Sequence, residues 1–185
     1  MCKKYTYGEI DMIKICFLAP SEYGKNTAVE ILKTKYNLIN IKIAEPLYHL
    51  QNYFYKYIGC NLSGEQDGEL LQYLGNKVRK ENPLFLLNNF QNELIKYKNY
   101  NGIISNDDCR PPDYHFLKEQ NFIFIKINGF KRNRIDHTKS NPKSNLEWQN
   151  QISFDYEVNN FGDMNTYKKN LFILMNQILI DKGEI

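Results

Sequence analysis

Cysteine and histidine are scarce in this chain of 185 residues, which holds four of the first and three of the second. The cysteines are Cys2, Cys16, Cys60 and Cys109. No two of them form a CxxC pair, and none lies near a histidine at the spacing of a zinc site, which excludes the usual zinc modules. We expect four reduced thiols, as in a protein of the cytoplasm.

Long apolar runs and a strong excess of one charge are also lacking. The N-terminal segment MCKKYTYGEIDM carries charges and no long hydrophobic stretch, so we expect neither a signal peptide nor a membrane anchor. Lys and Arg number 24 and Asp and Glu 21, giving a formal charge of +3, which is too small to bind a polyanion by bulk charge. The sequence therefore predicts a cytoplasmic protein with no membrane or nucleic-acid partner, and it leaves a homodimer open.

What the chain does contain is an alternation of strand-like and helix-like segments. Met12 to Ala19 (MIKICFLA) is an apolar run of strand length, and helical spacing follows from Lys25 to about Asn37. Further strands are expected at 38–44, 102–105, 121–127 and 154–158, and further helices at 47–58, 69–80, 83–97, 112–120 and 166–180. This order predicts one α/β domain over residues 1–185, with three layers and a mostly parallel sheet covered by helices on both faces.

The turn between the first strand and the first helix resembles a phosphate-binding loop. In the pattern GxxxxGK followed by Ser or Thr, backbone N–H groups turn onto phosphate oxygens, the lysine neutralises them and a hydroxyl holds Mg²⁺. Here the window runs from Ala19 to Thr27, and Gly24, Lys25 and Thr27 fit it. The position between a buried strand and a helix N-terminus supports a P-loop NTPase-like fold that binds ATP.

Two positions of this loop depart from the pattern, and a third adds a negative charge. Ala19 replaces the first glycine, Asn26 replaces the hydroxyl residue, and Glu22 places a carboxylate in a loop that should hold an anion. An amide oxygen can still coordinate a cation, so Asn26 is a candidate metal ligand. The alternative is a helix that simply starts after a strand, with Lys25 in solvent.

Four stretches, taken in order, resemble bacteriophage-type deoxynucleoside monophosphate kinases. They are LAPSEYGKNTAVEILK, IKIAEPLYHL, LLQYLGNKVRKENP and IISNDDCRPPDYHFLKEQNFIFIKI. In that family a GKDT-like loop replaces the commoner GKST, so Asn26 stands where the family tolerates Asp. The resemblance covers most of the chain up to Ile127.

This resemblance implies roles for particular residues. The donor phosphates would be bound by the loop residues Ser21, Tyr23, Gly24, Lys25, Asn26 and Thr27. Gln72, Arg79 and Arg110 would bind the acceptor nucleotide, although each arginine could instead form a surface salt bridge. Asp108 is chosen from its neighbours because it matches a DxR pattern with Arg110, and together with Asn26 it would hold Mg²⁺.

A basic segment would supply the lid that such kinases close over the donor. Residues 129–150 follow a strong strand and contain Arg132 and Arg134, which we expect to act on the transition state beside Lys25 and Asp108. A solvated basic loop is the alternative. Near the C-terminus, Asn159 or Asn160 would contact the donor base or cap a turn.

The aromatic stretch YHLQNYFYKY, residues 48–57, is the last feature to which the sequence assigns a role. We expect Phe54 in the core and one tyrosine against the acceptor base.

The sequence therefore predicts a kinase that transfers the γ-phosphoryl group of ATP to a nucleoside monophosphate, with Mg²⁺. Two alternatives stay open. One is a nucleotide-binding partner or regulatory subunit that has lost catalysis, and the other is a P-loop kinase acting on a modified base in DNA.

Overall fold

Five strands form a single parallel sheet in the computed structural model, which describes residues 12–62, 66–129 and 152–184. The strands are β1 (Ile13–Leu18), β2 (Leu38–Asn40), β3 (Ile103–Asn106), β4 (Ile123–Gly129) and β5 (Tyr156–Asn160). Their order is β2-β3-β1-β4-β5, and every neighbouring pair is parallel. The strand that precedes the glycine loop therefore lies at the centre of the sheet.

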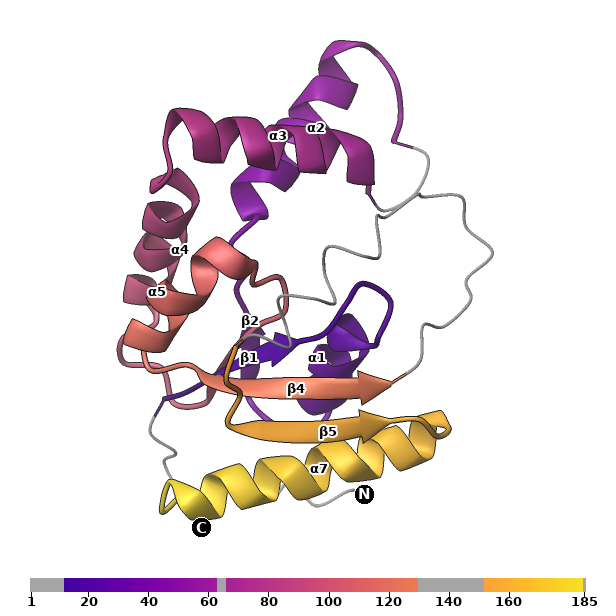
Figure 1. Ribbon diagram of the computed structural model, residues 1–185, viewed down its shortest axis with the longest axis vertical. Coiled ribbons are helices and arrows are strands. Elements are labelled where there is room, and N and C mark those ends of the chain that lie inside the picture. The colour runs from indigo at the N-terminus through magenta and orange to yellow at the C-terminus, as the bar shows by residue number, and fades with distance from the viewer. Residues whose placement is uncertain (1–11, 63–65, 130–151, 185) are drawn as a thin grey trace.

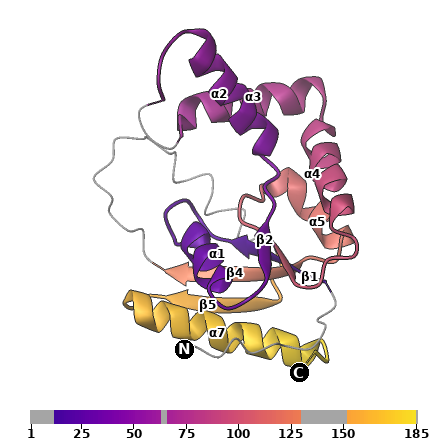
Figure 2. The same cartoon turned by 180° about the vertical axis from the view of Figure 1, so that it is seen from behind.

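Helices connect the strands and cover the sheet (Figures 1 and 2). They are α1 (Lys25–Lys33), α2 (Glu45–Tyr57), α3 (Gly68–Glu81), α4 (Phe85–Lys96), the 3₁₀ turn η1 (Pro111–Asp113), α5 (Tyr114–Glu119) and α7 (Met164–Asp181). The predicted α/β class with a parallel sheet and helices on both faces is confirmed.

Alternating side chains of β1 divide the core into two parts. Ile13, Ile15 and Phe17 pack with buried residues of α1 and α7 on one face of the sheet. Cys16 and Leu18 point to the other face, where the buried residues of α4 and α5 lie. A central strand buried on both faces explains why the run from 13 to 18 is apolar except at the half-buried Lys14.

The pair α2 and α3 extends beyond the sheet at the end opposite α7 (Figure 1). Asp67 caps α3, since its carboxylate accepts hydrogen bonds from the backbone N–H groups of Glu69 and Leu70. Phe54 of α2 is 45% exposed, so the prediction that it belongs to the core was wrong. The C-terminal half of α2 has too few neighbours to cover the ring.

Several boundaries differ from the sequence prediction. β2 ends at Asn40 rather than at residue 44, and α2 begins at Glu45 rather than Leu47. Pro83, expected in the first turn of a helix, precedes α4, whose N-cap is Leu84. Among the helices of the described residues, none is long and apolar enough to cross a membrane.

Candidate phosphate-binding site

The loop between β1 and α1 carries the backbone conformations that a phosphate loop needs. Gly24 is the N-cap of α1 and adopts a left-handed conformation with φ 99°, and Glu22 also has a positive φ of 71°. A side chain at Gly24 would be strained, which explains the glycine there. The loop thus turns the start of α1, with its unpaired N–H groups, toward the carboxyl end of the sheet.

Lys25 folds back into this loop. Its Nζ donates hydrogen bonds to the carbonyl oxygens of Ala19 at 2.6 Å and Pro20 at 3.0 Å. Burial, followed by repulsion from Arg110, lowers the pKa of Lys25 to about 8, while Asp107 and Asp108 act in the opposite direction. The lysine is therefore not solvated as in the alternative interpretation, and its charge lies inside the loop.

The other residues of the loop differ in how far their side chains are exposed. Ser21 and Asn26 are exposed, Thr27 is half-buried, and the ring of Tyr23 packs against the core shared with α1 and α7. We therefore expect Tyr23 to contribute to a phosphate site through its backbone.

Two acidic residues follow β3 but point in different directions. Asp108 accepts hydrogen bonds from the backbone N–H groups of Ile43 at 3.0 Å and Ala44 at 2.8 Å, and from the side-chain amide of Asn106. Burial raises the pKa of Asp108, and those backbone hydrogen bonds oppose the rise. Both of its oxygens are engaged in holding the chain before α2.

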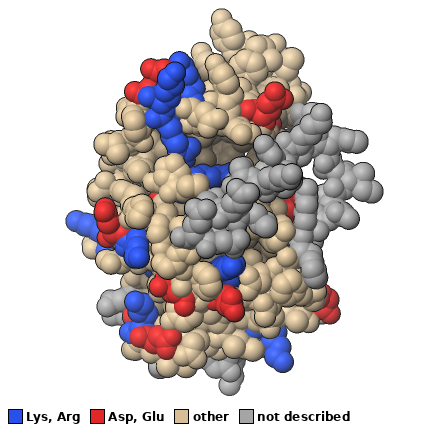
Figure 3. Space-filling model, in the orientation of Figure 1, with Lys and Arg blue, Asp and Glu red and all other residues tan. Residues whose placement is uncertain are grey.

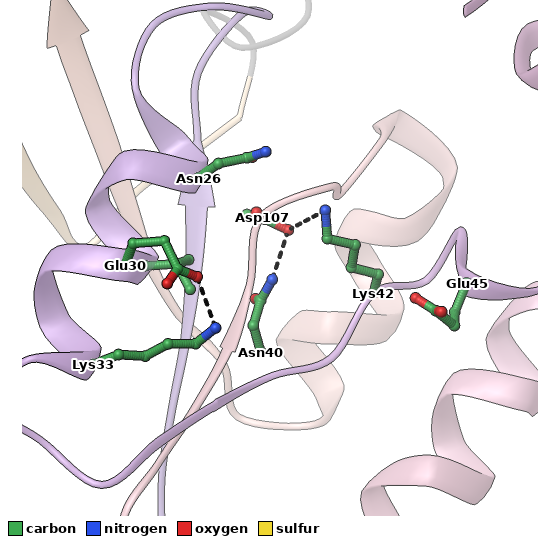
Figure 4. Close-up of a pocket in the computed structure, with 8 residues that line it drawn as sticks. Asn26, Glu30, Lys33, Asn40, Lys42, Glu45 and Asp107 are labelled. Carbon is green, nitrogen blue, oxygen red and sulfur yellow. Dashed lines mark hydrogen bonds and ion pairs between the residues drawn. The ribbon is translucent and has the colours of Figure 1, made fainter. Parts of the chain in front are cut away.

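Asp107, in contrast, lines a cavity of about 270 Å³ beside the first turn of α1 (Figure 4). Its Oδ1 accepts a hydrogen bond from Asn40 Nδ2 at 3.1 Å and lies 3.8 Å from Lys42 Nζ. Asn26 lines the same cavity from α1, and Glu45 lines it from α2. The structure thus brings Asn26 together with Asp107 rather than with Asp108.

The two arginines of the predicted acceptor site lie in different surroundings. Arg79 of α3 donates to both carboxylate oxygens of buried Asp113, at 3.2 and 3.1 Å. Arg110 has an exposed side chain; its charge adds to the lowering of the pKa of Lys25 and opposes the rise that burial causes in the pKa of Asp113. Arg110 therefore belongs to the electrostatic surroundings of the loop, whereas Arg79 forms a salt bridge as the alternative had it.

Gln72 is exposed on α3, and no contact of its side chain ties it to the loop. Arg132, Arg134 and the lid predicted at 129–150, apart from Gly129 at the end of β4, lie outside the described residues.

Sequence reasoning missed Asp107, Asn40 and Lys42, which meet at the ends of β2 and β3. The strands are neighbours with Asn40 in register with Ser105, so side chains just beyond both ends come together. The available signal was the rule that the carboxyl ends of adjacent parallel strands share one edge. Tyr48 lies near the same group, and burial, helped by Asp108 and Asp107, raises its pKa to about 12.

Positive and negative side chains are interspersed on the face seen in Figure 3. The described atoms of that face show no broad surface of one sign. Among the described residues, no three or more His, Cys, Asp or Glu side chains cluster as a metal site, so any cation here would need amide, backbone or ligand oxygens as well.

No family model matches the chain, and no curated protein matches it either. Among solved structures, a dephospho-CoA kinase from Campylobacter jejuni is 16% identical with a TM-score of 0.47, covering 95% of this chain and 99% of that one. A shikimate kinase from Bacteroides thetaiotaomicron is 12% identical with a TM-score of 0.49, covering 90% and 98%. A gluconokinase from Sinorhizobium meliloti is 13% identical with a TM-score of 0.45, covering 95% and 96%.

These likenesses assign neither a family nor a substrate. The fold assignment rests instead on the parallel sheet, its strand order and the glycine loop after the central strand. The resemblance to deoxynucleoside monophosphate kinases stays a prediction.

Proposed function

We propose that this protein transfers the γ-phosphoryl group of ATP to a (deoxy)nucleoside monophosphate, with Mg²⁺. The observation that carries the proposal is the position of Lys25. Its ammonium lies within the left-handed turn before α1, close enough to Asp107, Asp108 and Arg110 for their charges to affect its pKa. A cation in the loop that precedes a helix N-terminus, with the N–H donors of that terminus, suits a polyphosphate.

The residues of the loop have separate tasks in this proposal. Lys25 exchanges the two carbonyl oxygens it now contacts for phosphate oxygens, which are stronger acceptors because they are charged. The free N–H groups at the start of α1 stabilise the same negative charge. Phosphoryl transfer needs positioning and charge neutralisation more than a covalent nucleophile, so these groups form a sufficient donor site.

The residues present fit a magnesium ion. Asn26 and Asp107 offer an amide and a carboxylate oxygen to one cavity, and Mg²⁺ prefers oxygen ligands, of which phosphates supply several. When bound, the ion neutralises charge on the phosphates. We assign the metal-positioning role to Asp107 in place of Asp108, because the oxygens of Asp108 already accept backbone N–H groups.

The acceptor side of the site would lie beyond Asp107. Lys42 and Asn40 keep the Asp107 carboxylate in place from the end of β2, and Arg110 follows Asp108 by two residues with an exposed side chain. Arg110 is therefore our choice for the acceptor phosphate. The salt bridge of Arg79 gives it a supporting role.

The test is turnover with a panel of nucleoside and deoxynucleoside monophosphates, followed by separation of the diphosphates formed. Lys25→Met keeps the length of the side chain and removes its charge, and should lower turnover by at least about a hundredfold, in the range of removing one preorganised electrostatic contact. Lys182→Met makes the same change at an exposed lysine after α7 and should leave turnover unchanged. Wild-type protein that forms no diphosphate from any monophosphate refutes the proposal.

A nucleotide-binding partner without catalysis is the second candidate. Glu22, exposed within the loop at φ 71°, and Asn26 in place of a hydroxyl favour it. The two functions differ in the response to Asn26→Ser. A weakened enzyme gains turnover with this change, whereas a binding protein retains ATP affinity and stays inactive.

A further inference from the structure

Two side chains from the C-terminal part of the chain hold the phosphate-binding loop from behind. Asn160, the last residue of β5, donates from Nδ2 to the carbonyl oxygen of Tyr23 at 3.0 Å. Tyr167, in the first turns of α7, donates its hydroxyl to the carbonyl oxygen of Gly24 at 3.2 Å. Both residues are buried, and both lie more than 130 positions along the chain from the loop residue they contact.

These contacts fix the orientation of two successive peptide groups. In a planar trans peptide the N–H points opposite to the C=O. Holding the carbonyl of Tyr23 toward β5 therefore aims the N–H of Gly24 away from it. Holding the carbonyl of Gly24, which also accepts the first helical hydrogen bond from Ala28, likewise aims the N–H of Lys25 away from α7. Both donors then face the region where a phosphate would lie.

The space around Gly24 shows how closely Asn160 and Tyr167 pack against the loop. A Cβ on this residue would lie 2.5 Å from Asn160 Nδ2 and 3.4 Å from the ring of Tyr167. Glycine is therefore favoured by its φ and by the close approach of Asn160.

The side-chain oxygen of Asn160, Oδ1, gives a further indication of the role of this residue. Asn160 is 5% exposed, and its Oδ1 is the one buried side-chain nitrogen or oxygen in the described part of the chain that has no hydrogen-bond partner. A buried acceptor without a partner costs stability. Packing in the core does not account for a polar amide at this position. The hydrogen bond from its Nδ2 to the carbonyl of Tyr23 in the loop does.

We propose that Asn160 and Tyr167 are positioning residues that preset the phosphate-binding loop for the donor nucleotide. The proposal rests on the proposed function for its nucleotide, while the loop geometry it describes can be measured without one. The β5–α7 unit then serves as the back support of the site, acting on ATP through the peptide groups of Tyr23, Gly24 and Lys25.

The decisive variant is Tyr167→Phe, which removes one hydroxyl and keeps the buried ring. Tyr156→Phe is the matched control, because it also removes one tyrosine hydroxyl, which joins β5 to α7 through Asp181 at 2.5 Å and does not contact the loop. We expect Tyr167→Phe to raise the Kd and KM for ATP by roughly 3- to 10-fold, the effect of one hydrogen bond. The KM for the acceptor should stay constant, and Tyr156→Phe should leave the ATP affinity unchanged.

Asn160→Asp is a second variant, since it exchanges the amide NH2 donor for an oxygen facing the carbonyl of Tyr23, and it should weaken ATP binding further. Equal ATP affinity in wild type and Tyr167→Phe overturns the proposal, as does an equal loss in Tyr156→Phe.

Hydrogen exchange of the amides from 21 to 27, measured without nucleotide, separates this proposal from the proposed function. Positioning predicts faster exchange in Tyr167→Phe than in wild type or Tyr156→Phe. If wild type binds no ATP, the proposed function fails, and the exchange result alone decides whether Asn160 and Tyr167 hold the loop in place.

Discussion

Lys25 is the residue at which binding and stability should respond to pH in opposite directions. Its pKa of about 8 in the folded protein lies below the ordinary value of 10.5. Between these values the unfolded chain binds more protons, so this group raises the stability of the free protein as pH rises from 8 to 10.5. A bound phosphate favours the ammonium form, so over the same range ATP binding should weaken by up to about tenfold per pH unit.

Thermal unfolding and ATP titration from pH 7 to 10, each compared with Lys25→Met, measure both effects. The variant should lose the lysine's contribution to both slopes. A wild-type affinity for ATP that follows the Lys25→Met profile through this range contradicts the assignment.

Asp107 and Asp108 are neighbours whose replacement should have different consequences. Asp108→Asn places an amide NH2 group against the backbone N–H of Ile43 or Ala44 and should lower the free energy of unfolding by about 1–3 kcal/mol. Asp107→Asn keeps the shape of the side chain at the cavity wall and should abolish most turnover at near wild-type stability. Urea denaturation and turnover of both variants check this. The opposite pattern would return the metal-positioning role to Asp108.

At the scale of elements, the turn before α1 depends on space as well as on backbone conformation. Gly24→Ala should destabilise the protein and abolish ATP binding, because its Cβ adds a clash with Asn160 to the strain of φ 99°. Gly59→Ala is the matched control, with φ 71° and nothing within 4 Å of its Cβ, so it measures the strain alone, about 1–2 kcal/mol. Equal loss of stability in the two variants, measured by urea denaturation, would show that the contact with Asn160 has no consequence.

The sequence predicted some elements well because their signals are local. The apolar run at β1 and the helical spacing after Lys25 depend only on neighbouring residues. The end of β2 was placed too late, because a carboxylate some 65 residues away, on Asp108, takes the N–H groups of Ile43 and Ala44. The direction of the Asp107 side chain could not be predicted from the sequence either. Asp107 follows the end of β3, where a turn rather than strand alternation sets the direction of a side chain.

The candidate site assembles only in the whole molecule. Lys25 was identified from its motif, but the groups around it come from the ends of β2, β3 and β5 and from α7. No spacing in the sequence relates Tyr23 to Asn160 or Gly24 to Tyr167. The topology brings them together, because β1, β4 and β5 are parallel neighbours in the sheet and their carboxyl ends lie on the same side of it.

The salt bridge between Arg79 and Asp113 joins α3 to the segment that follows β3. Replacing either residue tests how the acceptor side of the site is held in place. Asp113 also accepts a hydrogen bond from the backbone N–H of Arg110 at 3.0 Å, and burial raises its pKa while Arg79 opposes the rise. Removing Arg79 leaves a buried carboxylate unpaired. Because the arginine side chain is itself 25% exposed, we expect Arg79→Ala to cost about 2–3 kcal/mol, less than breaking a fully buried pair.

Asp113→Asn, which leaves the arginine in place, distinguishes support from substrate contact. If the pair acts as one structural unit, both single variants lower stability and raise the acceptor KM together. The double variant then costs less than the sum of the two, by about 1 kcal/mol or more. Urea denaturation and acceptor KM of all three proteins provide the cycle. An Arg79→Ala protein with wild-type stability and a raised acceptor KM, beside an unaffected Asp113→Asn, would instead place the guanidinium on the acceptor itself.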